Sequence, residues 1–316
     1  MGPWRHIRAK LHANAGLGGR MIIEDEAMLT GAVRDAMRPT ADPRLRAVMD
    51  ALVRHLHAFV REVRPTEQEF EHAIGFVTGL GQATTNTHHE VILASDVLGV
   101  STLVGLLNNP AYAGETEAAL LGPFWRHGAP DLPLGASIVH RATGGLPVLV
   151  RGRVTARGGG PVEGALLDIW QSDPAGFYDN QDPALEGMNL RGRFRTDADG
   201  RYWFTTTKPA GYPVPTHGPV GALLHAQGRA PERPAHIHFM VSAPGRKTLV
   251  TQVFADDSAH LDWDVTFGVI RSLVARFQQQ DTLDGAPAGF TVPWCLLEYD
   301  FVLAPGESRF PKPPIR

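Results

Sequence analysis

Two histidines separated by a single residue, His236 and His238, have the clearest potential for chemistry in this sequence. They lie in the apolar run from Arg233 to Val241, which is typical of a β-strand. Alternate side chains of a strand share one face, so both imidazoles can reach the same metal ion. The plainer interpretation is two hydrogen-bonded histidines on a half-exposed strand. The spacing alone therefore leaves metal binding open.

A second pair with the same spacing, His55 and His57, gives a contrast. It lies in a segment with helical periodicity, where side chains two positions apart point about 200° apart around the axis. These two imidazoles cannot chelate one ion, and we expect them on a solvated face.

Composition restricts the ligands that could accompany His236 and His238. The chain of 316 residues has one cysteine, Cys295, which excludes an intrachain disulfide, a cysteine-based zinc site and an iron–sulfur cluster. The net charge of −3 gives no reason to expect nucleic acid or an anionic membrane as a partner. Neither a secretion signal nor a run of ~18 apolar residues is found, so we expect a cytoplasmic protein. Any metal would be bound by His, Tyr, Asp or Glu.

Several ligand sets can be compared by spacing. A cupin site needs a carboxylate three or four positions after the pair, and Phe239-Met-Val-Ser242 contains none. A two-His-one-carboxylate site at His260 and Asp262 expects a later histidine, and none follows His260. A tri-His zinc site that includes His217 or His225 remains open from spacing alone.

Tyrosines offer a further set of ligands. Only five occur in the chain, and both Tyr178 and Tyr212 lie in segments rich in Gly or Pro, where a tyrosine contributes little to strand packing. Taken alone, each is more often an aromatic residue that packs on a turn. Two phenolates with two imidazoles would favour a hard, oxidised ion, Fe(III).

The N-terminal third of the chain has helical periodicity. Asp42-Pro43 predicts a helix start, and an apolar stripe follows over residues 45–60. Thr66 and Glu69 form a capping box before a second helix. A third apolar run extends from about Glu90 to Leu107.

After residue 118 the period changes to short alternating runs separated by Gly and Pro. These predict strands at 148–154, 165–170, 193–196, 202–206, 236–242, 248–254 and 296–303, with one late helix at Val269–Phe277. We therefore predict an α+β fold, with an N-terminal helical domain (1–118) followed by an antiparallel β-sandwich catalytic domain (119–316).

An ordered set of segments runs through the predicted sandwich: Gly176-Phe-Tyr-Asp179, Leu190–Phe204, Gly211-Tyr-Pro-Val-Pro215 and Gly228–Phe239. Ile92–Val100 and Leu121-Gly-Pro-Phe124 extend the set into the helical region. Together they resemble the intradiol ring-cleavage dioxygenases over residues 40 to 305, most closely the hydroxyquinol 1,2-dioxygenase branch. Catechol and chlorocatechol 1,2-dioxygenases are near relatives.

This resemblance implies a non-haem Fe(III) bound by Tyr178, Tyr212, His236 and His238. It implies that Tyr212 accepts a substrate proton, that Arg233 stabilises negative charge on the ring, and that Gln252 lies beside the metal. The reaction would open hydroxyquinol between adjacent hydroxyls with O2, giving maleylacetate (3-hydroxy-cis,cis-muconate) in aromatic catabolism. Catechol or substituted catechols are the alternative substrates. Without the resemblance, a structural ion pair beside the strand would be the favoured interpretation of Arg233.

The resemblance also implies a set of residues around the substrate. These are Leu93, Asp96, Leu120, Leu121, Gly122, Pro123, Phe124, Val214, Pro215 and Thr266. A carboxylate at Asp96 could accept a hydrogen bond from the third hydroxyl of hydroxyquinol, or it could buttress its own helix. Leu121 stands where relatives often have a bulky aromatic residue, which would enlarge the pocket for chlorinated or alkylated rings.

The same resemblance implies a homodimer formed through the N-terminal helices, with a lipid bound between them. A different class of protein also matches part of the chain. Residues 148–212 are similar to prealbumin-like structural β-sandwich modules, which have no catalytic activity. Such a module has no use for Arg233, His236 and His238, and these downstream residues favour the enzyme.

Overall fold

The computed structural model describes residues 22–109, 114–182 and 185–314. The N-terminal segment that was inspected for a secretion signal lies outside these residues. The chain forms two compact units, 1–74 and 75–316, and the division falls within a helix, α3 (Glu67–Ala83). The change from helices to strands comes later, after residue 108.

The first unit contains α1 (Glu26–Ala36) and α2 (Pro43–Val63). Asp42 caps α2 as predicted, since its carboxylate accepts hydrogen bonds from the backbone N–H groups of Arg44 and Leu45. Arg34 pairs with Asp50 and joins the two helices. The predicted apolar stripe of α2 is exposed, at Val48, Leu52, Leu56, Phe59 and Val60.

The second unit contains the C-terminal half of α3 together with α4 (Glu90–Val97), α5 (Val100–Asn108) and α6 (Pro219–Ala226). The predicted capping box at Thr66 and Glu69 is present at the start of α3. The single helix predicted over 90–107 is divided in two, because Gly99 has a left-handed conformation (φ 71°) that ends regular hydrogen bonding. Among the described residues, no single helix is long and apolar enough to cross a membrane. Only α4 and α5 taken together, bent by 74°, meet the criteria of length and composition.

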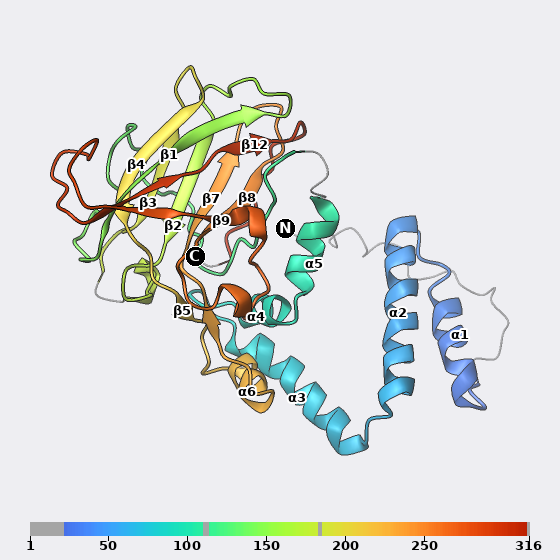
Figure 1. The fold of residues 1–316 in the computed structure, drawn as a ribbon. Helices are drawn as coiled ribbons and strands as arrows, with labels where there is room; N and C mark the ends of the chain where they lie inside the picture. Colours follow the sequence, from blue (N-terminus) through green and yellow to red (C-terminus); the bar gives the residue numbers. More distant parts are fainter. Residues whose placement is uncertain (1–21, 110–113, 183–184, 315–316) are drawn as a thin grey trace. The chain divides into compact units, whose positions relative to one another are not determined.

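Two five-stranded sheets make up the rest of this unit (Figure 1). The first has the order β10-β11-β1-β12 with β4 also paired to β1. Its strands are β1 (Pro147–Ala156), β4 (Arg201–Thr207), β10 (Phe277–Gln280), β11 (Trp294–Glu298) and β12 (Phe301–Leu303). The second has the order β3-β2-β7-β8-β9. Its strands are β2 (Leu166–Gln171), β3 (Arg191–Arg195), β7 (His236–Ser242), β8 (Leu249–Ala255) and β9 (Val274–Ala275). A separate ribbon pairs β5 (Tyr212–Pro213) with β6 (Glu232–Arg233).

The main core lies between the two sheets. Val150 of β1 and Phe204 of β4 pack with Ile169 of β2 and Phe239 of β7, all fully buried. This arrangement confirms the α+β fold and the β-sandwich. The sheets are mixed rather than purely antiparallel, because β1 pairs in parallel with β11 and β12, and β8 with β9.

The late helix predicted at Val269–Phe277 is wrong. Only a short 3₁₀ turn, Arg271–Leu273, is helical, and the chain then enters β9 and β10. Val274 pairs with Phe254 of β8, and the side chain of Phe277 is buried in the sandwich core. A short apolar run does not distinguish a helix from a strand. Here the pairing with β8 and the burial of Phe277 in the core favour the strand.

Candidate metal centre

The predicted histidine pair lies on β7, in the middle of the second sheet. His236 and His238 are both fully buried and share one face, with their Nε2 atoms 3.1 Å apart. Ile237, between them, points to the opposite face and belongs to the sandwich core. The two faces of β7 therefore have different roles: one packs in the sandwich core, and the other carries the two histidines.

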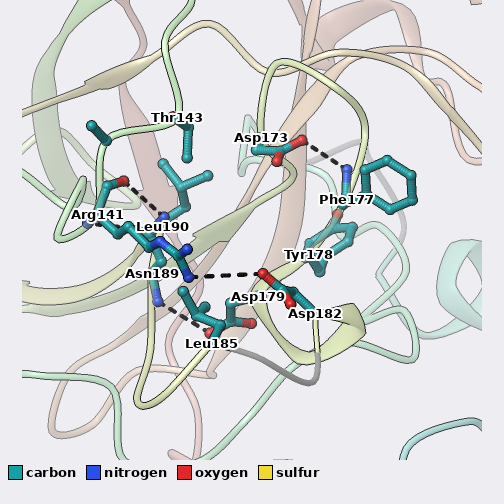
Figure 2. Close-up of a pocket in the computed structure, with 11 residues that line it drawn as sticks. Arg141, Thr143, Asp173, Phe177, Tyr178, Asp179, Asp182, Leu185, Asn189 and Leu190 are labelled. Carbon is teal, nitrogen blue, oxygen red and sulfur yellow. Dashed lines mark hydrogen bonds and ion pairs between the residues drawn. The ribbon is translucent and has the colours of Figure 1, made fainter.

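Tyr178 reaches this face from the loop that follows β2. The carboxylate of Asp173 holds the loop by accepting a hydrogen bond from the N–H group of Ala175. It accepts a second one from the N–H group of Phe177 (Figure 2). Gly176 adopts φ 91°, and a Cβ there would lie 3.1 Å from both the carbonyl oxygen of Gly211 and the Cβ of Tyr212. A glycine at this position lets the two tyrosine loops approach each other closely.

The second tyrosine is positioned by the ribbon of β5 and β6. Tyr212 pairs with Arg233 in this ribbon, only three residues before His236. Gly211 makes the close approach possible, because a Cβ there would lie 2.6 Å from the carbonyl oxygen of Arg233. The pairing brings Tyr212 and Arg233 to the same site as the two histidines.

Four donor atoms from these residues converge. The Nε2 atom of His238 is 3.1 Å from the hydroxyl of Tyr178, which is 3.2 Å from the hydroxyl of Tyr212. Ligands about 2.0–2.2 Å from one ion lie roughly 3 Å apart, so these separations suit shared coordination. The donor set of two imidazole nitrogens and two phenol oxygens fits Fe(III).

The ionisation of these groups agrees with a metal site. Burial, together with the charge of Arg233, lowers the pKa of His236 to about 3, and burial also lowers the pKa of His238. The Nδ1 atom of His236 lies 2.7 Å from the carbonyl oxygen of Pro234, so it carries the proton and leaves Nε2 as a lone pair. Burial raises the pKa of both tyrosines. A nearby cation would be needed to ionise them.

Polar side chains surround the four donors. The cross-strand partner of His238 on β8 is Gln252, whose side chain accepts a hydrogen bond from Arg233 Nη2 at 2.9 Å. Arg233 is buried and forms an ion pair with Asp264. The structure therefore brings Arg233, Gln252 and Tyr212 together. Asp264 was not singled out by the sequence, because no spacing rule connects it to the strand.

Trp170 is a second neighbour that the sequence did not indicate. It is the partner of His238 on β2, and the two rings stack with centroids 4.6 Å apart and planes 9° from parallel. The Nδ1 atom of His238 has no hydrogen-bond partner among the described residues. Stacking on Trp170 and the contact of Nε2 with the hydroxyl of Tyr178 therefore orient this ring. This contact depends on the register between β2 and β7, which cannot be derived from the sequence.

The residues predicted to surround the substrate differ in how directly they contact the donor residues. Gly122 faces His238, since a Cβ there would lie 3.3 Å from its Cε1 atom, and Phe124 stacks on Tyr178 at 4.4 Å. Leu121 packs on this aromatic cluster, and the carbonyl oxygen of Leu120 accepts a hydrogen bond from Gln252. Leu93 and Val214 share a second apolar cluster. Thr266 is buried against Asp264, while Pro123 and Pro215 are half-buried in their loops.

Asp96 is buried near the end of α4. Burial raises the pKa of its carboxyl to about 6, opposed by a hydrogen bond to Ser101 and by the charge of Arg233. At neutral pH the carboxyl group is mostly ionised and can accept a hydrogen bond.

A pocket of about 190 Å³ is lined in part by Phe177, Tyr178 and Asp179 (Figure 2). Its lining includes Arg141, Asp173 and Asn189. Beneath it, Asp179 and Arg191 form a buried ion pair with an Oδ1–Nη2 distance of 2.6 Å. This pair anchors the residue next to Tyr178, and Tyr178 itself contributes to the lining of the pocket.

The other metal sites considered from spacing receive no support. Within the part of the chain that the structure describes, no group of three His, Cys, Asp or Glu side chains could hold a metal ion. This applies to a tri-His zinc site and to the set at His260 and Asp262. The ring of His217 instead lies 5.3 Å from that of His88.

Comparisons with known proteins agree with this geometry. The family described as "Dioxygenase" matches residues 121–305, and "Catechol dioxygenase N terminus" matches residues 42–116. A hydroxyquinol 1,2-dioxygenase from Rhizobium sp. (strain MTP-10005) is 46% identical over 271 residues, covering 85% of this chain and 92% of that protein. A 6-chlorohydroxyquinol 1,2-dioxygenase from Cupriavidus pinatubonensis is 44% identical, covering 89% and 98%.

A solved structure extends the comparison to the fold. The hydroxyquinol 1,2-dioxygenase from Pseudomonas putida DLL-E4 superposes with a TM-score of 0.82 at 42% identity, covering 89% of this chain and 99% of that one. Matches of this length and identity exclude a structural β-sandwich module. The chain belongs to the intradiol ring-cleavage dioxygenase family.

Proposed function

We propose that this protein is a hydroxyquinol 1,2-dioxygenase with a non-haem Fe(III) bound by Tyr178, Tyr212, His236 and His238. The substrates would be benzene-1,2,4-triol and O2, and the ring would open between adjacent hydroxyls. The convergence of four donor atoms, each 3.1–3.2 Å from the next, carries the metal assignment. Identity of 46% to a hydroxyquinol 1,2-dioxygenase supports the substrate.

Bound ferric iron would supply Lewis acidity and hold the two adjacent oxygens of the ring. A diol loses protons when it binds in this way, and these protons need acceptors. By the family resemblance the hydroxyl oxygen of Tyr212 would take one, and burial would favour this tyrosine in its protonated form. Arg233 lies beside it with a buried positive charge that can stabilise negative charge on the ring.

Asp96 supports the choice of a trihydroxylated ring. A buried carboxylate that accepts a hydrogen bond from the third hydroxyl would be left unpaired by catechol, and such sites discriminate strongly. Replacing Asp96 by alanine should lower the hydroxyquinol-to-catechol ratio of kcat/KM by roughly 10- to 100-fold. Steady-state kinetics on both substrates measure this ratio.

Asp168 provides a matched control, because burial also raises the pKa of its carboxyl to about 6 but it bonds to Trp125. Asp168→Ala should leave the substrate ratio unchanged. An unchanged ratio in Asp96→Ala would contradict the role proposed for Asp96. A full preference for catechol or chlorocatechol in the unmodified protein would contradict the substrate assignment.

The exposed stripe of α2 supports a homodimer formed through the N-terminal helices, and the family resemblance adds a lipid chain bound between them. Leu56 and Phe59 are 51% and 59% exposed, which is unusual for large apolar side chains on one helix face. Light scattering of Leu56→Glu should show a shift from dimer to monomer. A monomer in the unmodified protein would rule the dimer out.

A further inference from the structure

The buried guanidinium of Arg233 is held at two of its three nitrogens. Its Nε donates to Asp264 Oδ1 at 3.1 Å, and its Nη2 donates to Gln252 at 2.9 Å and to Asp264 Oδ2 at 3.3 Å. The remaining nitrogen, Nη1, lies 3.4 Å from Nε2 of His236. Because a guanidinium is planar and rigid, fixing Nε and Nη2 also fixes the direction of Nη1.

Asp264 is itself held firmly by the turn that follows it. Its carboxylate accepts hydrogen bonds from the backbone N–H of Gly268 at 2.8 Å and from the hydroxyl of Thr266 at 3.0 Å. A Cβ on Gly268 would lie 3.0 Å from Asp264 Oδ2 and 3.1 Å from Arg233 Nη2. The turn therefore closes directly on the ion pair and leaves no room for a side chain.

The pair is also closed to solvent. The side chains of Arg233 and Asp264 are 3% and 2% exposed. Burial disfavours both charges, and each is stabilised only while the other is present and well aligned. Arg233 contacts Asp264 through Nε and Nη2 and His236 through Nη1. The position of the Asp264 carboxylate therefore determines where the guanidinium lies relative to the donor atoms.

We propose that Asp264 is a positioning residue for Arg233, which aims Nη1 at the space beside His236 and Tyr212 where substrate would bind. Asp264 touches no donor atom and acts only through the guanidinium. This inference rests on the proposed function, because it assumes that Arg233 acts on a ring bound at the iron.

The test uses Asp264→Asn, which keeps the shape of the side chain and an oxygen for the N–H of Gly268 but removes the charge. With hydroxyquinol, kcat per bound iron should fall roughly 10- to 100-fold, with a smaller change in KM. The visible absorption of the bound iron should persist. In an Arg233→Met background, Asp264→Asn should add no further loss, because a residue that acts through another is not additive with it.

Glu90→Gln is the matched control for a purely structural role. Glu90 is fully buried, and its Oε1 accepts the N–H of Val220 at the start of α6, without contact to Arg233. It should lower the melting temperature and leave kcat unchanged. If Asp264→Asn does not fold, Gly268→Ala displaces the same pair more gently and should lower kcat in the same direction.

Three results would overturn the proposal: wild-type kcat per bound iron in Asp264→Asn, an equal loss in Glu90→Gln, or additive losses in the double variant. Failure of the proposed function looks different. In that case the unmodified, iron-loaded protein would itself be inactive on hydroxyquinol.

Discussion

The chain contains two His-x-His pairs, and only one of them forms a site. On α2, His55 is exposed, and His57 is bonded through Nδ1 to the hydroxyl of Thr30 at 2.9 Å. On β7, His236 and His238 are fully buried with their Nε2 atoms 3.1 Å apart. The spacing in sequence is identical. Residues two positions apart share a face in a strand but not in a helix, so the type of element determines whether the two rings can bind one ion.

Burial adds a second difference between the pairs. The strand is the middle of a five-stranded sheet, and its neighbours supply Trp170 on one side and Gln252 on the other. The helix has one packed side and a solvated one. A metal site therefore needs the strand for alignment and the sheet for its surrounding residues.

The largest effect should come from removing one ring of each pair. His238→Ala removes a donor atom, so iron binding and ring cleavage should fall by more than the ~10- to 100-fold typical of losing an outer neighbour of a metal ligand. His57→Ala should leave both unchanged. Iron content and oxygen uptake with hydroxyquinol measure the difference. Equal activity in the two variants would remove the distinction between the pairs.

A pH titration of metal-free protein should show the next effect. Because the pKa of His236 falls from 6.5 to about 3 on folding, the unfolded state binds more protons in this window. The free energy of unfolding should therefore decrease as pH falls below 6.5, by roughly 2 kcal/mol at pH 5 from His236. The lowered pKa of His238 acts in the same direction.

Denaturant unfolding at pH 7 and pH 5 tests this expectation. His236→Asn should show a correspondingly smaller pH dependence, while His57→Asn should follow the unmodified protein. The same pH dependence in all three proteins would mean that the buried pair titrates normally.

Glycines in the two regions give the smallest effects, with opposite signs. Gly31 lies inside α1 with open space around it, so Gly31→Ala should stabilise the protein by about 0.5–1 kcal/mol. Gly122 has φ 72° and faces His238, so Gly122→Ala should destabilise it and weaken iron binding about 10-fold. Thermal unfolding and iron titration measure both. Stabilisation by Gly122→Ala would show that the loop does not constrain His238.

Sequence patterns predicted the elements that depend on local rules. The strand His236–Ser242 was predicted with its observed ends, and the caps at Asp42 and Thr66 are present. The break at Gly99 was missed because a glycine within an apolar run does not by itself indicate a left-handed turn. The helix at Val269–Phe277 was wrongly predicted because this apolar run is too short to distinguish helical from strand periodicity.

The site was predictable to the extent that it follows motifs. Strand spacing indicated His236 and His238, and the family resemblance completed the ligand set with Tyr178 and Tyr212. The donor atoms of these four residues converge. Neighbours that depend on strand register or on a distant turn were missed. Trp170 reaches His238 across the sheet, and Asp264 reaches Arg233 from a turn 31 residues later in the chain.

The most direct test of the account is iron titration of metal-depleted protein, followed by visible absorption. A ferric site with two phenolate ligands should turn the protein burgundy at one iron per chain, and Tyr178→Phe should weaken or shift the band. A folded protein that stays colourless with iron, or a colour unaffected by Tyr178→Phe, would contradict the assignment of Tyr178, Tyr212, His236 and His238 as ligands.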